Sequence, residues 1–349
     1  MLINFGLIFA RERETLDERG EKLRVAINGF GRMGRSIARV ILQTPDIELV
    51  GINDVSSWEV LHYLFQNDSV HRKLPAQTRL EGNTMYVNDT PITLFSCANP
   101  QELDFGEVDV VIESSGRFLT QELTSHHLSK GAKRVILSAP SLDDTPTFVL
   151  GVNAEQYQGQ KIISNASCTT NALAPICKII DKHFGIESGI LSTIHSYTND
   201  QNLLDNAHRS DFRRSRCAGL NIIPTSTGSA KALHRVLPNL KGKMHGHSLR
   251  VPVADVSMVD LALKVAKKTN QEELNALFES YIQGEMSGIL GFDEEFRVSS
   301  DFIGNPLSSI IAKDLSFTLQ DNHLKIMAWY DNEWGYANRI VEMARFICD

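Results

Sequence analysis

The sequence predicts an α/β protein with two domains. The first is a doubly wound parallel sheet, and the second is an α/β domain with a mostly antiparallel sheet. The length of 349 residues fits two domains of about 150 residues each. A glycine-rich turn lies between a predicted buried strand, residues 23–27, and a predicted helix, residues 35–43. A second apolar strand follows at residues 47–52, as expected for a parallel sheet.

We expect the chain to divide into an N-terminal extension (1–22), a first domain (23–167), a second domain (168–332) and a C-terminal helix (333–349). The helix has apolar residues at helical spacing and is expected to return to the first domain. In the extension, charged residues follow the apolar stretch, which is the reverse of a signal peptide. We assign it no function, since an upstream start codon or a frayed terminal helix explains it.

The composition argues against several classes of protein. The net charge of −7 gives no basic footprint, so we expect no dedicated nucleic-acid site. No apolar run approaches the roughly 18 residues of a membrane span. The 5 cysteines are scattered without C-x-x-C spacing, which indicates neither a metal site nor a disulfide framework. A reducing compartment, the cytoplasm, fits this pattern.

The glycine-rich turn has the pattern G-x-G-x-x-G, in which each glycine has a physical role. Gly29 would make the tight turn, Gly31 would let a pyrophosphate approach the backbone, and Gly34 would let helix and strand pack closely. The phosphates would lie at the helix N-terminus, where free N–H groups favour negative charge. The intervening residues belong to the same predicted cofactor site: Phe30, Arg32 and Met33. On its own, such a pattern is also compatible with a simple tight turn.

Asp54 follows the second strand, about 20 residues after Gly34, where an acid can bind the adenosine ribose hydroxyls of a dinucleotide. The alternative is a turn or helix-capping aspartate. Further predicted strands at 108–113 and 134–137, with a helix at 120–130 between them, end in polar residues. Since ligands bind beyond the carboxyl ends of such strands, these residues are expected to line the cofactor cleft. They are Ser115, Gly116 and Ser138.

The second half contains candidate catalytic residues. Cys168 lies in a polar segment before an apolar helix, residues 173–184, and a helix N-terminus lowers a thiol pKa. His195 follows a predicted strand, residues 190–194, and either takes the thiol proton or shares a thiolate–imidazolium pair. Taken singly, the cysteine also fits a small buried residue and the histidine a structural one.

Basic and hydroxyl residues farther along indicate anion binding. Arg213, Arg214 and Arg216 cluster in a chain of net negative charge, although a solvated loop or a subunit contact also explains them. Arg250 ends a predicted strand, and residues 225–228 offer hydroxyls and a glycine. Arginine and small hydroxyl residues are typical of phosphate sites.

These segments, in this order, resemble the phosphorylating glyceraldehyde-3-phosphate dehydrogenase family. The resemblance extends from about residue 23 to the end of the chain and is carried by residues 28–34, 167–171, 195–201, 224–228, 249–252 and 329–336. It implies that Cys168 attacks an aldehyde, that His195 acts as base, and that hydride passes to a nicotinamide cofactor. Inorganic phosphate would then release the acyl group from a thioester as 1,3-bisphosphoglycerate.

The resemblance also implies residues that bind ligands. Asn332 would hold the nicotinamide carboxamide. One pocket would hold the phosphate of glyceraldehyde 3-phosphate, through Thr198, Asp200 and Arg250. A second pocket would hold inorganic phosphate, through Ser167, Thr227 and Gly228, and Thr169 belongs to the same substrate site. The family further implies a cytoplasmic homotetramer acting in glycolysis or gluconeogenesis.

The sequence departs from the family around the adenosine ribose. Asn206 and Ala207 stand where NAD-specific members usually have Leu-Pro, and Val55 stands where Leu is usual. These residues resemble members that accept NADP, whereas Asp54 would repel a 2′-phosphate. We therefore expect NAD as cofactor, with NADP also accepted.

Three other functions fit parts of the pattern. Erythrose-4-phosphate dehydrogenase has the same machinery and a longer substrate, but residues 196–199 resemble the glyceraldehyde phosphate enzyme more closely. A non-catalytic binding or adhesion protein is disfavoured by the intact Cys168 and His195. A cysteine hydrolase would leave the dinucleotide site idle.

Overall fold

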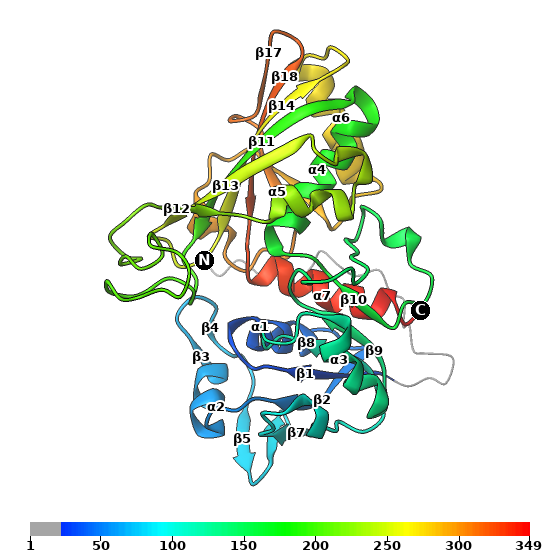
Figure 1. Cartoon of the computed structure of the whole chain (residues 1–349), viewed down its shortest axis with the longest axis vertical. Coiled ribbons are helices and arrows are strands. Elements are labelled where there is room, and N and C mark those ends of the chain that lie inside the picture. The colour runs from blue at the N-terminus through cyan, green and yellow to red at the C-terminus, as the bar shows by residue number, and fades with distance from the viewer. Residues whose placement is uncertain (1–21) are drawn as a thin grey trace.

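The computed structural model describes residues 22–349, so almost all of the predicted N-terminal extension lies outside the described part. The chain forms two α/β halves, one above the other, each with an eight-stranded sheet (Figure 1). The first sheet is mostly parallel and the second mostly antiparallel, which confirms the predicted fold class.

The first sheet has β1 at its centre, and its strands from β10 to β7 run parallel. In order across the sheet, the strands are β10 (Ile162–Ser164), β9 (Ala132–Leu137), β8 (Val108–Glu113), β1 (Leu23–Asn28), β2 (Ile47–Asn53), β7 (Thr90–Phe95), β6 (Thr84–Val87) and β5 (Thr78–Glu81). The helices of this half are α1 (Arg32–Ile41), α2 (Trp58–Gln66) and α3 (Gln121–Ser129), and a small hairpin joins β3 (Asn67–Asp68) to β4 (Arg72–Lys73).

Helices cover both faces of the first sheet. Alternate residues of each strand point to opposite sides, so neighbouring residues pack against different helices. Val25 of β1 packs in the cluster that contains Ile37 of α1, whereas Ala26 packs on the other side with Leu128 of α3. The predicted strand at 108–113 coincides with β8, and the other predicted strands of this half are each extended by one or two residues.

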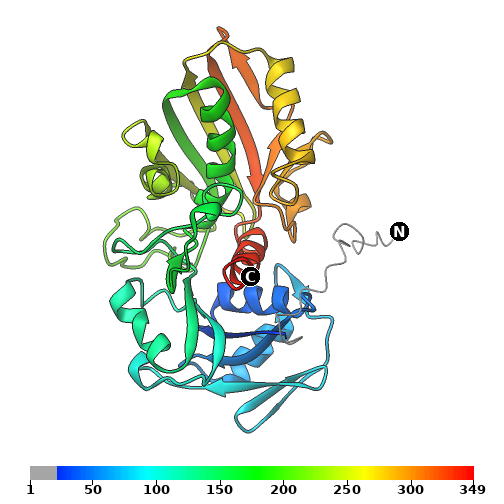
Figure 2. The ribbon, with the colours of Figure 1, turned by 90° about the vertical axis from the view of Figure 1, so that its right-hand side faces the viewer.

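The second sheet crosses from β12 to β15, with β17 beside β18. Its strands, in order, are β12 (Ile223–Ser226), β13 (Met244–Val251), β11 (Ile186–Ser196), β14 (Ser257–Val265), β18 (His323–Tyr330), β16 (Ser309–Ala312), β15 (Leu290–Asp293) and the flanking β17 (Phe317–Leu319). Its helices are α4 (Cys168–Phe184), α5 (Ser229–Ala232) and α6 (Gln271–Gln283), and α4 and α6 pack against one face of the sheet (Figure 2).

The last helix, α7 (Trp334–Phe346), leaves the second sheet and lies along α1, so the end of the chain packs on the first half (Figures 1 and 2). Ile340 and Ala344 share the buried cluster of Val25 and Ile37. Within residues 22–349, no helix has the length and apolar content needed to cross a bilayer.

Helix α4 begins at Cys168, earlier than the predicted start at residue 173. Its first turn is polar, so the apolar pattern does not reveal it. The Ser167 hydroxyl caps this turn by accepting a hydrogen bond from the Thr170 N–H at 3.1 Å. The cap therefore places Cys168 at the first helical position.

The glycines of the first turn allow a paired test of stability. A Cβ at Gly34 would lie 2.0 Å from the Gly29 carbonyl oxygen, whereas a Cβ at Gly31 would meet nothing within 4 Å. We expect Gly34→Ala to lower the free energy of unfolding by about 3 kcal/mol, as overpacking does. Gly31→Ala should unfold in urea like the wild type, and equal losses in the two variants would contradict the close packing at Gly34.

Candidate active site

The predicted nucleophile opens onto a cavity of about 450 Å³ between α4 and strands β11–β13. Both residues predicted for catalysis, Cys168 and His195, line it, as do five of those predicted for substrate binding: Ser167, Thr169, Thr227, Gly228 and Arg250. Arg214 also lines it. The cavity therefore combines one thiol, one imidazole and two guanidinium groups in one space.

Strand register brings the imidazole and a guanidinium together. β11 and β13 are parallel neighbours, and their register pairs His195 with Arg250. A Gly246 Cβ would lie 2.4 Å from the Leu191 carbonyl oxygen, so glycine is needed for these strands to pair this closely. His195 and Arg250 are far apart in sequence, and only the strand pairing sets the distance between them.

Cys168 and His195 face each other, with the cysteine Sγ 3.7 Å from the histidine Nε2. His195 Nδ1 lies 2.7 Å from the Ser196 carbonyl oxygen. Arg250 Nη1, which only donates, lies 2.8 Å from the same Nδ1, but it also donates to the Ser196 carbonyl at 3.0 Å. Because the carbonyl can only accept, we assign the imidazole proton to Nδ1, which leaves Nε2 as an acceptor toward the thiol. The pair therefore has the geometry of a nucleophile and its general base.

Burial sets the protonation of this pair. It raises the pKa of the Cys168 thiol, while the Thr169 hydroxyl and the Arg250 charge act in the opposite direction. Burial and the Arg250 charge lower the pKa of His195 to about 3. Both groups are therefore neutral at pH 7, and of the two alternatives left open by the sequence, these directions favour proton transfer from thiol to imidazole over a resting ion pair.

Thr198 and Asp200 do not line the cavity. Thr198 bonds to Gln201 through its N–H at 2.8 Å. Asp200 forms an ion pair with Arg214 and lies 3.3 Å from His208 Nε2. Arg214 also donates to the Thr225 hydroxyl at 2.8 Å, which fixes its guanidinium at the cavity wall. Asp200 thus reaches the cavity through Arg214. The sequence shows the arginine cluster but not which member faces inward.

The glycine-rich turn fits a dinucleotide. A Cβ at Gly29 would lie 2.5 Å from the Ser115 nitrogen, so the loops after β1 and β8 touch. Beside Gly31, by contrast, the space is open, and no side chain in the described part of the chain caps the N-terminus of α1. Free N–H groups next to open space suit a pyrophosphate. Phe30 and Met33 lie in or beside this turn, with Phe30 fully buried.

The other residues predicted for the cofactor lie along the same edge of the first sheet. Asp54 accepts hydrogen bonds from the Phe30 N–H at 2.7 Å and from the Ser56 N–H at 2.9 Å, so its carboxylate is fixed. Ser115 bonds to the Glu113 carboxylate and Ser138 to the Glu113 carbonyl. Gly116 has a φ of 70°, which favours glycine. Asn332, by contrast, comes from the second sheet and is bonded to Ser196 and Ser257.

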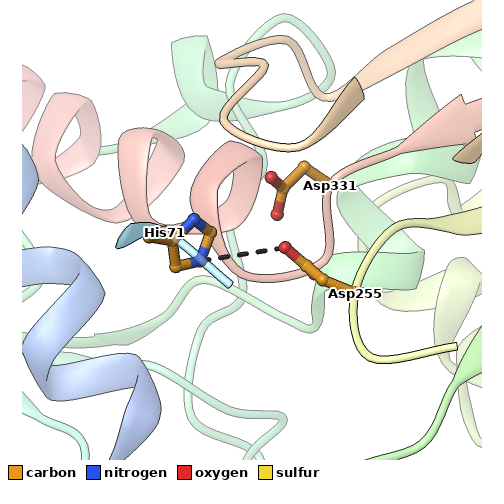
Figure 3. Close-up of side chains that lie close together, drawn as sticks. All are labelled: His71, Asp255 and Asp331. Atoms are coloured by element: carbon orange, nitrogen blue, oxygen red, sulfur yellow. Dashed lines mark ion pairs between the residues drawn. The ribbon is translucent and has the colours of Figure 1, made fainter. Parts of the chain in front are cut away.

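A buried charge cluster joins the two halves beside Asn332. In Figure 3 the carboxyl groups of Asp255 and Asp331 point toward each other and toward His71. Their ligand-type atoms all lie within 4.8 Å of one another. His71 Nε2 lies 3.0 Å from Glu333, which also forms an ion pair with Arg32 in the glycine-rich turn. The predicted cofactor residue Arg32 is therefore committed to this cluster.

We describe the cluster as a network of charged groups and not as a metal site, although the Asp255 oxygens accept no hydrogen bond from the described residues. The Asp331 carboxylate already accepts N–H groups from Gly304, Glu333 and Trp334. Burial, with the nearby Asp331 and Glu333 charges, raises the pKa of Asp255 to about 9. Asp255 is therefore a neutral acid at pH 7. Sequence reasoning missed Asp255 and His71, which show no pattern of their own in the sequence.

Comparisons with known proteins agree with this arrangement. The model of the glyceraldehyde 3-phosphate dehydrogenase NAD binding domain matches residues 23–121, and that of the C-terminal domain matches residues 167–332. The chain is 51% identical to the Helicobacter pylori glyceraldehyde-3-phosphate dehydrogenase over 93% of this chain and 99% of that protein. It is 45% identical to Bacillus subtilis glyceraldehyde-3-phosphate dehydrogenase 1, over 93% and 98%. Against the cytosolic enzyme of Pinus sylvestris it is 46% identical, over 92% and 96%.

The neutral Asp255 predicts a pH dependence of stability. Asp255 loses its proton above about pH 4 in the unfolded chain but only above about pH 9 in the folded protein. Between these two values the unfolded state is favoured more as pH rises, so the contribution of Asp255 to stability falls. Asn cannot titrate, so Asp255→Asn should gain thermal stability relative to the wild type as pH rises from 5 to 9. The measurement is the melting temperature of both proteins across this range, and a constant difference would contradict a protonated Asp255.

Proposed function

The chain belongs to the glyceraldehyde-3-phosphate dehydrogenase family, and from this premise we propose that it oxidises glyceraldehyde 3-phosphate, with inorganic phosphate and NAD, to 1,3-bisphosphoglycerate. The observation that carries the proposal is the facing pair of Cys168 Sγ and His195 Nε2, 3.7 Å apart, in a cavity with Arg214 and Arg250. The pair supplies an activated nucleophile, and the guanidiniums supply charge for a phosphorylated substrate.

In the first step, His195 Nε2 takes the thiol proton while Cys168 Sγ bonds to the aldehyde carbon. The resulting thiohemiacetal oxygen is close to the N-terminus of α4 and to His195, which stabilise negative charge. Bound NAD supplies the hydride acceptor. His195 returns its proton to this oxygen, which becomes a hydroxyl. Loss of hydride from the carbon to the cofactor, and of the hydroxyl proton back to His195, then leaves a thioester on Cys168.

In the second step, an oxygen of inorganic phosphate attacks the thioester carbon, the carbon–sulfur bond breaks and the acyl phosphate is released. Cys168 leaves as a thiolate, which takes back the proton held by His195. Because water attack would hydrolyse the thioester, the site must exclude water and admit phosphate. Ser167, Thr227 and Gly228 are proposed to hold this phosphate. Arg250, with Thr198 and with Asp200 acting through Arg214, is proposed to hold the phosphate of the substrate. Thr169 completes the site.

The cofactor site is proposed to comprise the glycine-rich turn, Asp54, the loops at Ser115, Gly116 and Ser138, and Asn332. The division into domains at residues 23–167, 168–332 and 333–349 belongs to the same proposal. Neither erythrose-4-phosphate oxidation nor a purely non-catalytic role is favoured. The relatives are named glyceraldehyde-3-phosphate dehydrogenase, and the chain matches them over nearly their full length.

A homotetramer is also proposed. The segment between β11 and β12 exposes large apolar side chains, which are typical of protein interfaces. They are Leu203, Leu204, Phe212, Leu220 and Ile222. Light scattering gives the mass in solution, and a monomer at micromolar concentration would contradict the tetramer. The relatives include bacterial and cytosolic proteins, which supports a cytoplasmic location.

The function is tested by mixing the protein with NAD, phosphate and either glyceraldehyde 3-phosphate or erythrose 4-phosphate, and following the absorbance of reduced nicotinamide. We expect phosphate-dependent reduction with the first aldehyde. Cys168→Ser should abolish it and still bind NAD. Cys177→Ser, which changes a fully buried thiol, should retain it. Activity only with the longer sugar, or unchanged activity in Cys168→Ser, would overturn the proposal.

Arg250 gives a test of the substrate phosphate site. Arg250→Leu should lower kcat/KM for glyceraldehyde 3-phosphate. The expected loss of transition-state stabilisation is about 2–3 kcal/mol, the scale of a hydrogen bond to a charged group. Glyceraldehyde without phosphate should lose much less. Because Arg250 also contacts His195 at 2.8 Å, equal losses with both aldehydes would show that the residue acts on the imidazole instead.

Use of NADP stays a prediction. The Asp54 carboxylate is held by two backbone N–H groups, and it would lie close to a 2′-phosphate. Its repulsion at ~4 Å amounts to several kcal/mol at an effective dielectric near 20. We therefore expect activity with both cofactors but a preference for NAD. If kcat/KM with NAD exceeds kcat/KM with NADP by more than about 1000-fold, or roughly 4 kcal/mol, Asp54 alone decides the choice of cofactor.

A further inference from the structure

The Asn332 side chain is held in one orientation. Its Oδ1 accepts hydrogen bonds from the Ser257 hydroxyl at 2.7 Å and the Ser196 hydroxyl at 3.0 Å. We assign Oδ1 to this position because it gives both hydroxyl protons an acceptor. The Asn332 Nδ2 donates to no described residue, and it is not a fully buried atom. It is therefore left as a free donor.

Ser257 is itself fixed. Its Oγ accepts the Ser196 N–H at 3.1 Å, so its own proton is directed to Asn332. The residue is completely buried, and it starts β14 in register with Tyr330 of β18. Ser257 thus transmits the position of the β11 backbone to the Asn332 amide.

The turn before Ser257 is strained and lies beside the first half of the chain. Val256 has a φ of 66°, which is unfavourable for a β-branched residue. Asp255, just before it, lies in the buried cluster, with Oδ2 3.7 Å from His71 Nε2. Strain of this kind persists only where the surroundings fix both sides of the turn.

We propose that Ser257, which follows the strained turn at Val256, is a positioning residue that keeps the Asn332 Nδ2 directed at the nicotinamide carboxamide. The donor would meet the carbonyl oxygen of that carboxamide and not its NH₂. The inference rests on the proposed function, in which Asn332 holds this group. It assigns the orientation of the amide to hydroxyls that do not touch the cofactor.

The test compares NAD with ADP-ribose, which lacks the nicotinamide. Calorimetric titration of each into the wild-type protein and Ser257→Ala measures the two dissociation constants. We expect the variant to bind NAD about 5- to 10-fold more weakly, the value of one hydrogen bond, and ADP-ribose within about 2-fold of the wild type. Ser309→Ala is the matched control, because that hydroxyl is equally buried and has no partner among the described residues. It should change neither constant.

Equal weakening of NAD and ADP-ribose would show a merely structural role and overturn the inference, as would no change in either. If Ser257→Ala does not fold, Ser257→Cys keeps the shape with a weaker donor and should show the same selective loss. Failure of the proposed function has a different signature. In that case the wild type would bind ADP-ribose as tightly as NAD, or would not reduce NAD with the phosphorylated aldehyde.

Discussion

The turn between β18 and α7, residues 330–333, is the constraint on which the site depends. Tyr330 bonds to Thr169 at the start of α4, and Asn332 to the hydroxyls at the ends of β11 and β14. Glu333 pairs with Arg32 in the glycine-rich turn. This one turn therefore contacts the helix of the proposed nucleophile through Tyr330 and the proposed phosphate-binding loop through Glu333, and it fixes the Asn332 amide between them. A shift of this turn would move all of them together.

Buried charge makes this arrangement strict. An ion pair taken out of water stabilises little by itself, but removing one partner leaves an uncompensated charge that costs several kcal/mol. Glu333 satisfies both Arg32 and His71, and Asp331 is satisfied by backbone N–H groups. Alternative positions of the two halves would leave these groups unpaired, so the cluster favours one relative placement.

The proposed catalytic pair differs from this cluster in its electrostatics. Within residues 22–349, no carboxylate pairs with Cys168 or His195, and burial keeps both neutral at pH 7. Charge then develops only when the thiol proton moves to the imidazole. The positive end of α4 and Arg250 lie where the negative charge forms. A site of this kind favours the reacting state over the resting one.

The sequence by itself determined the class of each half, because this depends on local order along the chain, and its resemblance to a known family predicted the reacting pair. The strand–glycine–helix pattern indicates a dinucleotide-binding turn wherever it folds, and Cys168 precedes an apolar helix whose face must be buried. Tertiary structure alone decided which arginine faces the cavity, that α4 begins at Cys168, and that His71, Asp255 and Asp331 meet. Those contacts join segments far apart in sequence, and their polar residues follow no periodic pattern. Only the sheet register and the packing of the two halves bring them within hydrogen-bonding distance.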